Sequence, residues 1–324
     1  MRGAFFRTLM ELAERNERVH LVVGDLGFGV VEPFVARFPN RFLNAGVAEQ
    51  NMTGIATGMA LSGKVVFTYS IGNFPTLRCL EQVRNDVCYH GANVKIVSVG
   101  GGFAYGPLGM SHHTTEDIAI MRALPGMVVV APGDPVEAEE ATRAVGAHSG
   151  PCYLRLGRAG EPTVHMRPIS FELGKAILVR DGYHVTLIST GGLLSLAVEV
   201  SEDLARAGYR ARVLSMHTIK PMDTEAVLIA ARETQAVVTL EEHSILGGLG
   251  GAVAEILAES GTAVAFKRIG LPSTFCCKAG SQAYLLEQFG ISREGVLSSV
   301  REVLKDLRGF SPKRCKEKGS SAQQ

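Results

Sequence analysis

Apolar runs of strand length alternate with segments of helix length along most of the chain. These runs are continuously apolar, a pattern typical of strands in a parallel sheet that helices cover on both faces. We predict strands at residues 19–25, 64–70, 94–100, 127–134, 151–158, 184–190, 210–218, 236–243 and 263–272. Helices are predicted at residues 48–61, 76–89 and 135–148, with further helical segments between the later strands. This alternation indicates an α/β fold with right-handed crossovers.

The predicted strands fall into two series, which we expect to form two doubly wound domains with largely parallel sheets. A polar stretch that contains glycine and proline separates the two series. We place the first domain at residues 1–160, a linker at 161–173 and the second domain at 174–308. Residues 309–324 are polar and basic, and we expect this tail to be disordered.

Composition narrows the class of protein. Hydrophobic residues make up 46% and charged residues 20% of the 324 residues, which suits a globular enzyme. Lys and Arg together number 33 and Asp and Glu 32, so a net charge of +1 favours neither nucleic acid nor a membrane surface as a partner. No apolar run is long enough to span a bilayer, and the first helix lacks the apolar core of a signal peptide. We therefore expect a cytoplasmic protein.

The cysteines give no sign of a metal site. They are Cys79, Cys88, Cys152, Cys276, Cys277 and Cys315. None belongs to a C-x-x-C pair or to a spacing typical of zinc, so we predict scattered, reduced thiols and no metal bound by this chain itself.

Residues that could bind a ligand or take part in catalysis follow several predicted strands. In an open α/β sheet, ligands bind beyond the carboxyl ends of the strands. The stretches concerned are residues 44–50, 68–74, 100–117 and 154–158. The third is long and rich in glycine, as functional loops often are. The side chains of interest are Glu49, Phe74, His112, His113, Arg155 and Arg158. Each also has an ordinary explanation: a first-turn carboxylate, a core aromatic, loop histidines and solvated arginines at a strand end.

Taken together, these stretches resemble the transketolase family. Its pyrimidine-binding domain is similar to the stretches RFLNAGVAEQNMTGIATGMALSG, VFTYSIGNFPTLRCLEQVRNDV and GMSHHTTEDIAIMRALPGMVVVAPGDPVEAEEA. Its C-terminal domain is similar to VTLISTGGLLSLAVEVSEDL, HTIKPMDTEAV and VVTLEEHSILGGLGGAVAE. The resemblance covers roughly residues 5–305 and is most specific where Glu49, His112 and the LPGM-x-V-x-x-PGDP-x-E spacing combine. Transketolase, deoxyxylulose-5-phosphate synthase and, more distantly, the β-subunits of 2-oxoacid dehydrogenases belong to this family.

The resemblance implies thiamine diphosphate as the cofactor. In this family the glutamate of the GVAEQ stretch, here Glu49, bonds N1′ of the pyrimidine and so promotes loss of the thiazolium C2 proton. Phe74 falls near the aromatic residue that stacks on the pyrimidine ring, with Tyr69 as the alternative. Asp25, in VVGDLG, matches an acidic position near the cofactor and the dimer interface.

The resemblance also suggests substrate-binding residues. His112 matches the histidine of a G-x-[ST]-H motif that lies near the substrate carbonyl and hydroxyls, and His113 is the weaker candidate beside it. Arg158, in LRLGR, occupies the place of an arginine that binds a sugar phosphate. Two departures affect the substrate. Leu108 replaces an aspartate found in members that act on hydroxylated ketoses, and residues 100–102 are glycines where deoxyxylulose-phosphate synthase has an arginine.

One family element is missing from the chain. The family holds the diphosphate through Mg²⁺ with a GDG motif followed by asparagine, and Mg²⁺ prefers such oxygen ligands. Here the sequence reads GDL at Gly24 and GDP at Gly133, without GDG, and family enzymes are about twice this length. We therefore predict the C-terminal half of a split enzyme. Its partner is an N-terminal transketolase-like subunit that carries GDG…N and binds most of the Mg²⁺, in a heterotetramer of two copies of each.

We expect this enzyme to transfer a two-carbon ketol unit between sugar-like, phosphorylated small molecules. Two alternatives stay open. A β-subunit of a 2-oxoacid dehydrogenase would co-purify with a lipoyl-bearing acyltransferase. A catalytically silent assembly subunit has no need of the activating glutamate, so the presence of Glu49 argues against it.

Overall fold

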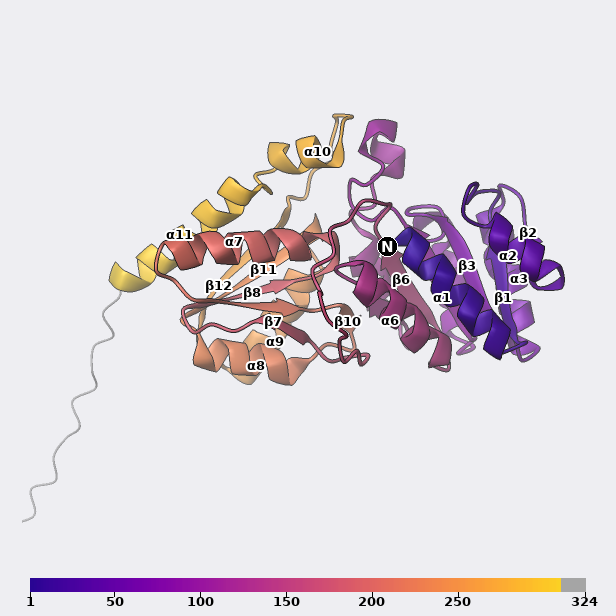
Figure 1. Cartoon of the computed structure of the whole chain (residues 1–324), viewed down its shortest axis with the longest axis horizontal. Helices are drawn as coiled ribbons and strands as arrows, with labels where there is room; N and C mark the ends of the chain where they lie inside the picture. The colour runs from indigo at the N-terminus through magenta and orange to yellow at the C-terminus, as the bar shows by residue number, and fades with distance from the viewer. Residues whose placement is uncertain (310–324) are drawn as a thin grey trace, which may run out of the picture.

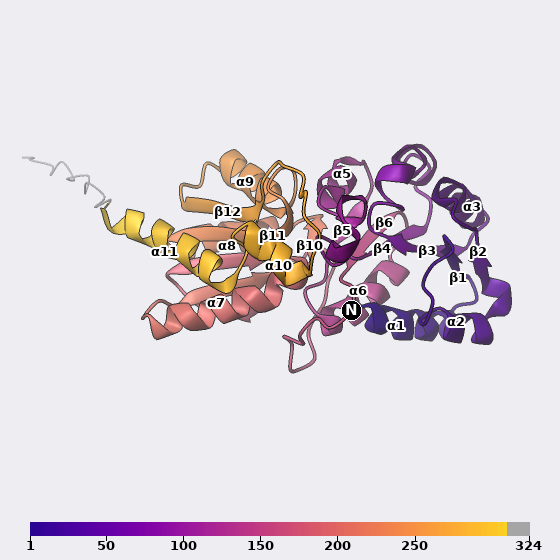
Figure 2. The ribbon, with the colours of Figure 1, turned by 90° about the horizontal axis from the view of Figure 1, so that it is seen from above.

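The computed structural model describes residues 1–309, whose strands form two sheets lying side by side (Figure 1). Helices cover both faces of each sheet (Figures 1 and 2). The predicted α/β class with two largely parallel sheets is therefore confirmed. Apart from residue 309, the tail predicted to be disordered lies outside the described residues, and so does Cys315.

The first sheet runs in the order β10-β5-β6-β4-β3-β1-β2. Its strands are β1 (Val19–Val23), β2 (Phe42–Asn44), β3 (Val65–Ile71), β4 (Val94–Val99), β5 (Val128–Val130), β6 (Cys152–Leu156) and β10 (Thr218–Lys220). Strands β1 to β6 pair in parallel. The central strands β4 and β6 are buried along their whole length, as expected for strands that helices cover on both faces.

Helices sandwich this sheet. On one face lie α1 (Arg2–Arg15) and α6 (Pro135–Ala147); on the other lie α3 (Glu49–Leu61) and α5 (Asp117–Ala123) (Figure 2). The helices predicted at residues 48–61 and 135–148 are confirmed. The second begins sharply because Asp134 caps it, accepting from the Glu137 backbone N–H at 2.8 Å, with proline at its first position. Short elements nearby are α2 (Glu32–Arg37) and the 3₁₀ turns η1 (Pro39–Arg41), η4 (Gly106–Leu108) and η5 (Met110–His112).

The second sheet runs in the order β12-β11-β8-β9-β7. Its strands are β7 (Ile177–Arg180), β8 (Val185–Ser189), β9 (Ala211–Ser215), β11 (Ala236–Ser244) and β12 (Ala265–Leu271), of which β7 is antiparallel to its neighbour. One face packs against α7 (Leu194–Arg206) and α11 (Arg293–Gly309), and the other against α8 (Thr224–Glu233) and α9 (Leu249–Ser260). The remaining elements are η6 (Gly191–Leu193) and α10 (Gln282–Gln288).

The strand predicted at residues 210–218 is wrong in its last part. After β9 the chain leaves the second sheet, and β10 adds antiparallel to β5 at the edge of the first sheet. The crossing is anchored by the Ala131 backbone N–H, which donates to the His217 carbonyl at 2.7 Å. Residues of the second series thus complete the first sheet.

The single helix predicted at residues 76–89 is also wrong. The segment consists of a 3₁₀ turn η2 (Leu77–Cys79), one α turn α4 (Leu80–Gln82) and a π-helical turn η3 (Val83–Cys88). The Thr76 hydroxyl donates to the Gly72 carbonyl at 2.9 Å, a local bond that competes with regular helix formation. Such irregular turns are frequent at functional sites.

No helix within residues 1–309 combines the length and the apolar character that crossing a bilayer requires.

The outer face of α3 carries two glycines. Gly54 and Gly58 are exposed one turn apart, and a Cβ added to either glycine would meet no atom within 4 Å. Glycine inside a helix is unfavourable relative to alanine because it loses more backbone freedom on folding. Nothing in the described part of the chain therefore explains why these two positions are glycine.

We predict that Gly58→Ala raises the free energy of unfolding of the isolated chain by about 0.5–1 kcal/mol, because alanine restricts the unfolded backbone and meets no clash. Urea unfolding of the two proteins measures this difference, with Gly54→Ala as a parallel variant. A marked loss of stability would show that α3 packs here against another part of the same chain.

Candidate functional site

The carboxyl ends of β1 and β2 are joined by a reciprocal pair of side chains. The Asn44 side-chain amide donates to the Asp25 carboxylate, and the Asp25 backbone N–H donates to the side-chain oxygen Oδ1 of Asn44, each at 2.9 Å. The Gly46 backbone N–H donates to the same Asn44 oxygen at 3.0 Å. Asp25 is exposed and adopts φ 53°, a strained conformation for a residue with a side chain. This turn leads the chain from β2 into α3 and so positions Glu49.

Glu49 lies in the first turn of α3 and is only 2% exposed. Its Oε2 accepts a hydrogen bond from the Arg78 guanidinium at 2.7 Å. A buried carboxylate needs such a partner, because an unpaired charge away from water is very costly. On its other side Glu49 packs against Gly24, where a Cβ would stand 3.2 Å from Glu49 Cγ. A side chain at position 24 would therefore crowd Glu49, and glycine avoids this.

Phe74 is half-buried beside the same pair. The Arg78 guanidinium carbon lies 4.6 Å from the centre of the Phe74 ring, and the His112 ring meets it edge-on at 5.3 Å. Arg78 thus links the carboxylate to the aromatic ring. Arg78 is not in any motif that points to a site, and its place four residues after Phe74 is the one signal in the sequence.

Tyr69, the alternative stacking residue, lies in the core. It is 1% exposed, and its ring stacks on Phe5 at 6.0 Å and meets Phe6 edge-on at 5.0 Å. Burial raises the pKa of its hydroxyl well above the usual range. The structure therefore does not support Tyr69 as a residue that stacks on a ligand.

The adjacent histidines face different surroundings. His112 is half-buried next to Phe74; burial, and then the neighbouring His113, lowers the pKa of His112 and so favours the neutral ring. A neutral imidazole can donate one hydrogen bond and accept another. His113 is buried, with its ring edge-on to Phe103 at 4.9 Å and its Nε2 3.3 Å from the Gly106 carbonyl.

The two arginines of β6 and its end also differ. Arg158 is exposed, with its guanidinium carbon 5.1 Å from the centre of the Tyr105 ring, and that ring lies 6.5 Å from His112. Arg155, expected to be solvated at the strand end, is instead buried and pairs with Asp117 at 2.7 Å. Arg158 therefore borders the site, whereas Arg155 lies inside the protein.

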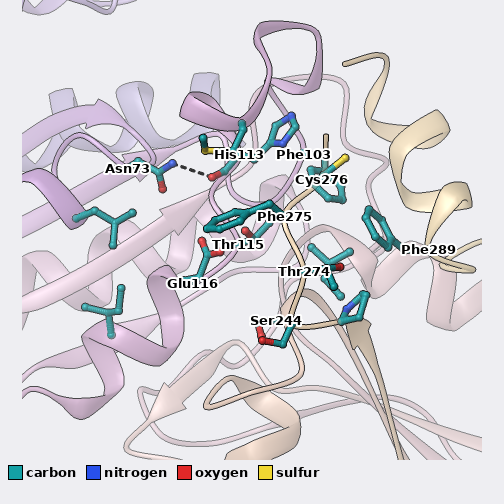
Figure 3. Close-up of a pocket in the computed structure, with 16 residues that line it drawn as sticks. Asn73, Phe103, His113, Thr115, Glu116, Ser244, Thr274, Phe275, Cys276 and Phe289 are labelled. Carbon is teal, nitrogen blue, oxygen red and sulfur yellow. Dashed lines mark hydrogen bonds between the residues drawn. The ribbon is translucent and has the colours of Figure 1, made fainter. Parts of the chain in front are cut away.

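A pocket of about 400 Å³ is lined by residues of the histidine loop and by residues of the second domain (Figure 3). Asn73 and His113 come from the first domain, whereas Phe275 and Phe289 come from the second. The Asn73 amide donates to the His113 carbonyl at 2.8 Å, the dashed contact in Figure 3. Phe275 is 74% exposed.

The structure thus brings most of the predicted residues together. Glu49, Phe74 and His112 form a continuous group through Arg78, and Arg158 joins it through Tyr105. Asp25 follows Gly24, which touches Glu49. Within residues 1–309, no three His, Cys, Asp or Glu side chains converge in a way that could hold a metal ion.

Comparison with known proteins identifies the family. The description "Transketolase, pyrimidine binding domain" matches residues 1–161, and "Transketolase, C-terminal domain" matches residues 174–296. The chain belongs to the transketolase family.

Several transketolase relatives match nearly the whole chain. The 6-deoxy-6-sulfo-D-fructose transketolase subunit of Clostridium sp. (strain MSTE9) is 39% identical over 94% of this chain and 94% of its own length. An apulose-4-phosphate transketolase subunit of Phocaeicola vulgatus is 38% identical over 94% of this chain and 97% of its own length. A solved structure described as a split gene transketolase, inactive beta4 tetramer, is 36% identical, with a TM-score of 0.85 over 94% of this chain and 97% of that one.

The transketolase family depends on thiamine diphosphate, and the residues of this chain fit the pyrimidine end of that cofactor. A buried carboxylate, Glu49, can face a ring nitrogen, and the half-buried ring of Phe74 can cover an aromatic face. Gly24 leaves open the space beside the carboxylate that a Cβ would fill.

We predict that the two aromatic residues respond differently to truncation. Tyr69→Ala should lower the free energy of unfolding of the isolated chain by about 3–5 kcal/mol, because it opens a cavity in the core. Phe74→Ala should cost the isolated chain less than about 1 kcal/mol, since its ring borders the site. Urea unfolding of both variants checks this. A core-sized loss for Phe74→Ala would make Phe74 a packing residue and remove its role in the site.

Proposed function

We propose that this chain is the C-terminal subunit of a two-component transketolase that transfers a two-carbon ketol unit between sugar-like substrates. The observation that carries the proposal is the buried Glu49 paired with Arg78 beside Phe74. It occurs in a chain whose two domains both match the family, and relatives of the same length are named as transketolase subunits.

Each residue has one task in this proposal. Bound thiamine diphosphate supplies the carbanion chemistry that ketol transfer needs. Glu49 exchanges a proton with the pyrimidine nitrogen, Arg78 holds the Glu49 carboxylate in place, and Phe74 covers the face of the ring. Asp25, on the neighbouring strand end, shapes the edge of the site next to Gly24.

The substrate lies against His112 and Arg158. The neutral His112 ring hydrogen-bonds a substrate hydroxyl or carbonyl and moves a proton. The exposed guanidinium of Arg158 binds an anionic group through charge-assisted hydrogen bonds. One relative is named for a sulfonated sugar and another for a phosphorylated one, so a terminal anion is the shared property of the substrates. The buried His113 packs inside the loop and stabilises it, and does not bind the substrate.

The position of Leu108 affects substrate choice. Leu108 is exposed in η4, at the position where ketose-specific members have an aspartate. Its side chain cannot form a hydrogen bond with a substrate hydroxyl. We infer relaxed preference at that hydroxyl. The relatives described above are transketolases, and no observation favours the 2-oxoacid dehydrogenase alternative.

The N-terminal subunit supplies what this chain lacks. We infer that it carries GDG…N and holds the diphosphate and Mg²⁺, in a heterotetramer of two copies of each chain. The sequence without GDG supports this, as does a split-gene relative described as an inactive β4 tetramer. Gly54 and Gly58 of α3 would let a partner pack closely there, because they leave the helix backbone accessible.

We predict that Glu49→Gln lowers turnover of the assembled enzyme by about 10²–10⁴, the usual effect of losing an acid–base group, since glutamine cannot exchange a proton. Hydrogen–deuterium exchange at C2 of bound thiamine diphosphate should slow in parallel. Glu81→Gln, an exposed carboxylate close to Arg78 in sequence, serves as the control and should change neither. Normal C2 exchange in Glu49→Gln would exclude the assigned role.

We also predict that the chain needs its partner. Calorimetry of the chain alone with thiamine diphosphate and Mg²⁺ should give binding no tighter than roughly millimolar, because the phosphates stay in water. Adding the N-terminal subunit should produce tight binding and turnover together, and Gly58→Leu should weaken assembly while the chain stays folded. Micromolar binding and turnover by the chain alone would contradict the two-component proposal.

A further inference from the structure

The loop that carries both histidines is closed at its neck. The Gly102 backbone N–H donates to the Thr114 carbonyl at 2.7 Å, and the Thr114 N–H donates to the Gly102 carbonyl at 2.8 Å. Residues 103–113 therefore form a compact loop whose two ends are held together. The position of the His112 ring depends on how this neck is fixed.

A carboxylate from the second domain reaches one strand of the neck. Glu242, on β11, is 4% exposed, and its Oε1 accepts from the Phe103 backbone N–H at 2.7 Å. Its Oε2 accepts from the Gln282 amide at 2.8 Å, so both oxygens are engaged. A Cβ on Gly102 would lie 2.3 Å from Glu242 Cδ, so glycine at this position is a condition of the contact.

Arg155 holds the other strand of the neck. Its Nη2 donates to the Thr114 carbonyl at 2.8 Å and to the Glu242 carbonyl at 2.9 Å, and its Nε donates to Asp117 at 2.7 Å. A Cβ on Gly101 would lie 2.6 Å from the guanidinium carbon. Gly101 and Gly102 thus let buried charged groups approach the neck from both sides.

Phe103 connects the neck to the histidines. Its ring stacks on Phe289 at 5.8 Å and meets His113 edge-on at 4.9 Å. Fixing the Phe103 backbone therefore fixes the surface on which His113, the neighbour of His112, rests. Phe289 directly follows α10, so this support comes from the second domain as well.

We propose that Glu242 is a positioning residue, which clamps the neck of the histidine loop from the second domain and so keeps His112 at Phe74. The clamp itself is a property of the chain alone. Its consequence for turnover rests on the proposed function, because that function makes His112 a substrate ligand.

The charge on Glu242 makes the clamp dependent on pH. Burial raises the pKa of Glu242 to about 7; the groups facing it are Arg155 of β6, which favours the charged form, and Asp117 of α5, which opposes it. Glu241 precedes it on β11, and burial raises the pKa of that group to about 7 as well. A charged acceptor forms a stronger hydrogen bond than a neutral one. The loop should therefore be held more firmly at pH 8 than at pH 6.

Hydrogen–deuterium exchange of the isolated full chain, read by mass spectrometry, tests the clamp without catalysis. Glu242→Ala should speed exchange of residues 103–113 by about tenfold at pH 8, the loss expected for a charge-assisted hydrogen bond. Glu242→Gln keeps an acceptor oxygen for Phe103 and should remove the difference between pH 6 and pH 8, after correction for intrinsic exchange.

Glu241→Gln is the matched control. Its carboxylate is equally buried on the same strand, but it accepts from the Leu249 and Gly250 backbone N–H groups at 2.7 and 2.8 Å. This variant should alter exchange at the start of α9 and leave the loop unchanged. Loop exchange in folded Glu242→Ala equal to that of the wild type would overturn the proposal. Should that variant not fold, a pH dependence in Glu242→Gln equal to the wild type would overturn it instead.

Discussion

A guanidinium can be buried only where its N–H groups find acceptors, and Arg155 imposes this constraint where the two sheets meet. Its acceptors come from the histidine loop, from α5 and from the end of β11. Each must converge on the end of β6, which requires a glycine at 101 and a neck that returns at Thr114. The hydrogen bonds that the buried Arg155 requires therefore constrain both the path of the histidine loop and the position of β11 next to β6.

The apolar runs predicted most strands well, because runs of strand length that are apolar throughout are typical of strands buried on both faces. The prediction lost accuracy where tertiary partners decide the outcome. The predicted strand that contains β9 ends at Thr218, yet residues 218–220 pair with β5, a choice that local sequence does not encode. The segment 76–89 has helical composition, but the Thr76 hydroxyl and the contact of Arg78 with Glu49 favour irregular turns.

The candidate site divides in the same way. Glu49 and His112 stand in recognisable stretches, so pattern and resemblance were enough to select them. Arg78 and Glu242 act through partners 29 and 139 residues away, and neither separation is visible in a local pattern. The choice between Phe74 and Tyr69 needed the position of α1, because Phe5 and Phe6 of that helix enclose the Tyr69 ring. The roles of these residues stay predictions until the variants are measured.

The passage of β10 into the first sheet bears on whether the two halves of the chain are autonomous. If the chain were cut between residues 161 and 173, β5 would lose β10 and become an edge strand of the first sheet. Such an unpaired edge can pair with strands of other molecules. The second fragment would keep Thr218–Lys220 without the strand it pairs with, and His217 without the Ala131 N–H that binds its carbonyl. The two regions that match separate family descriptions therefore share one sheet, and we expect neither to fold independently of the other.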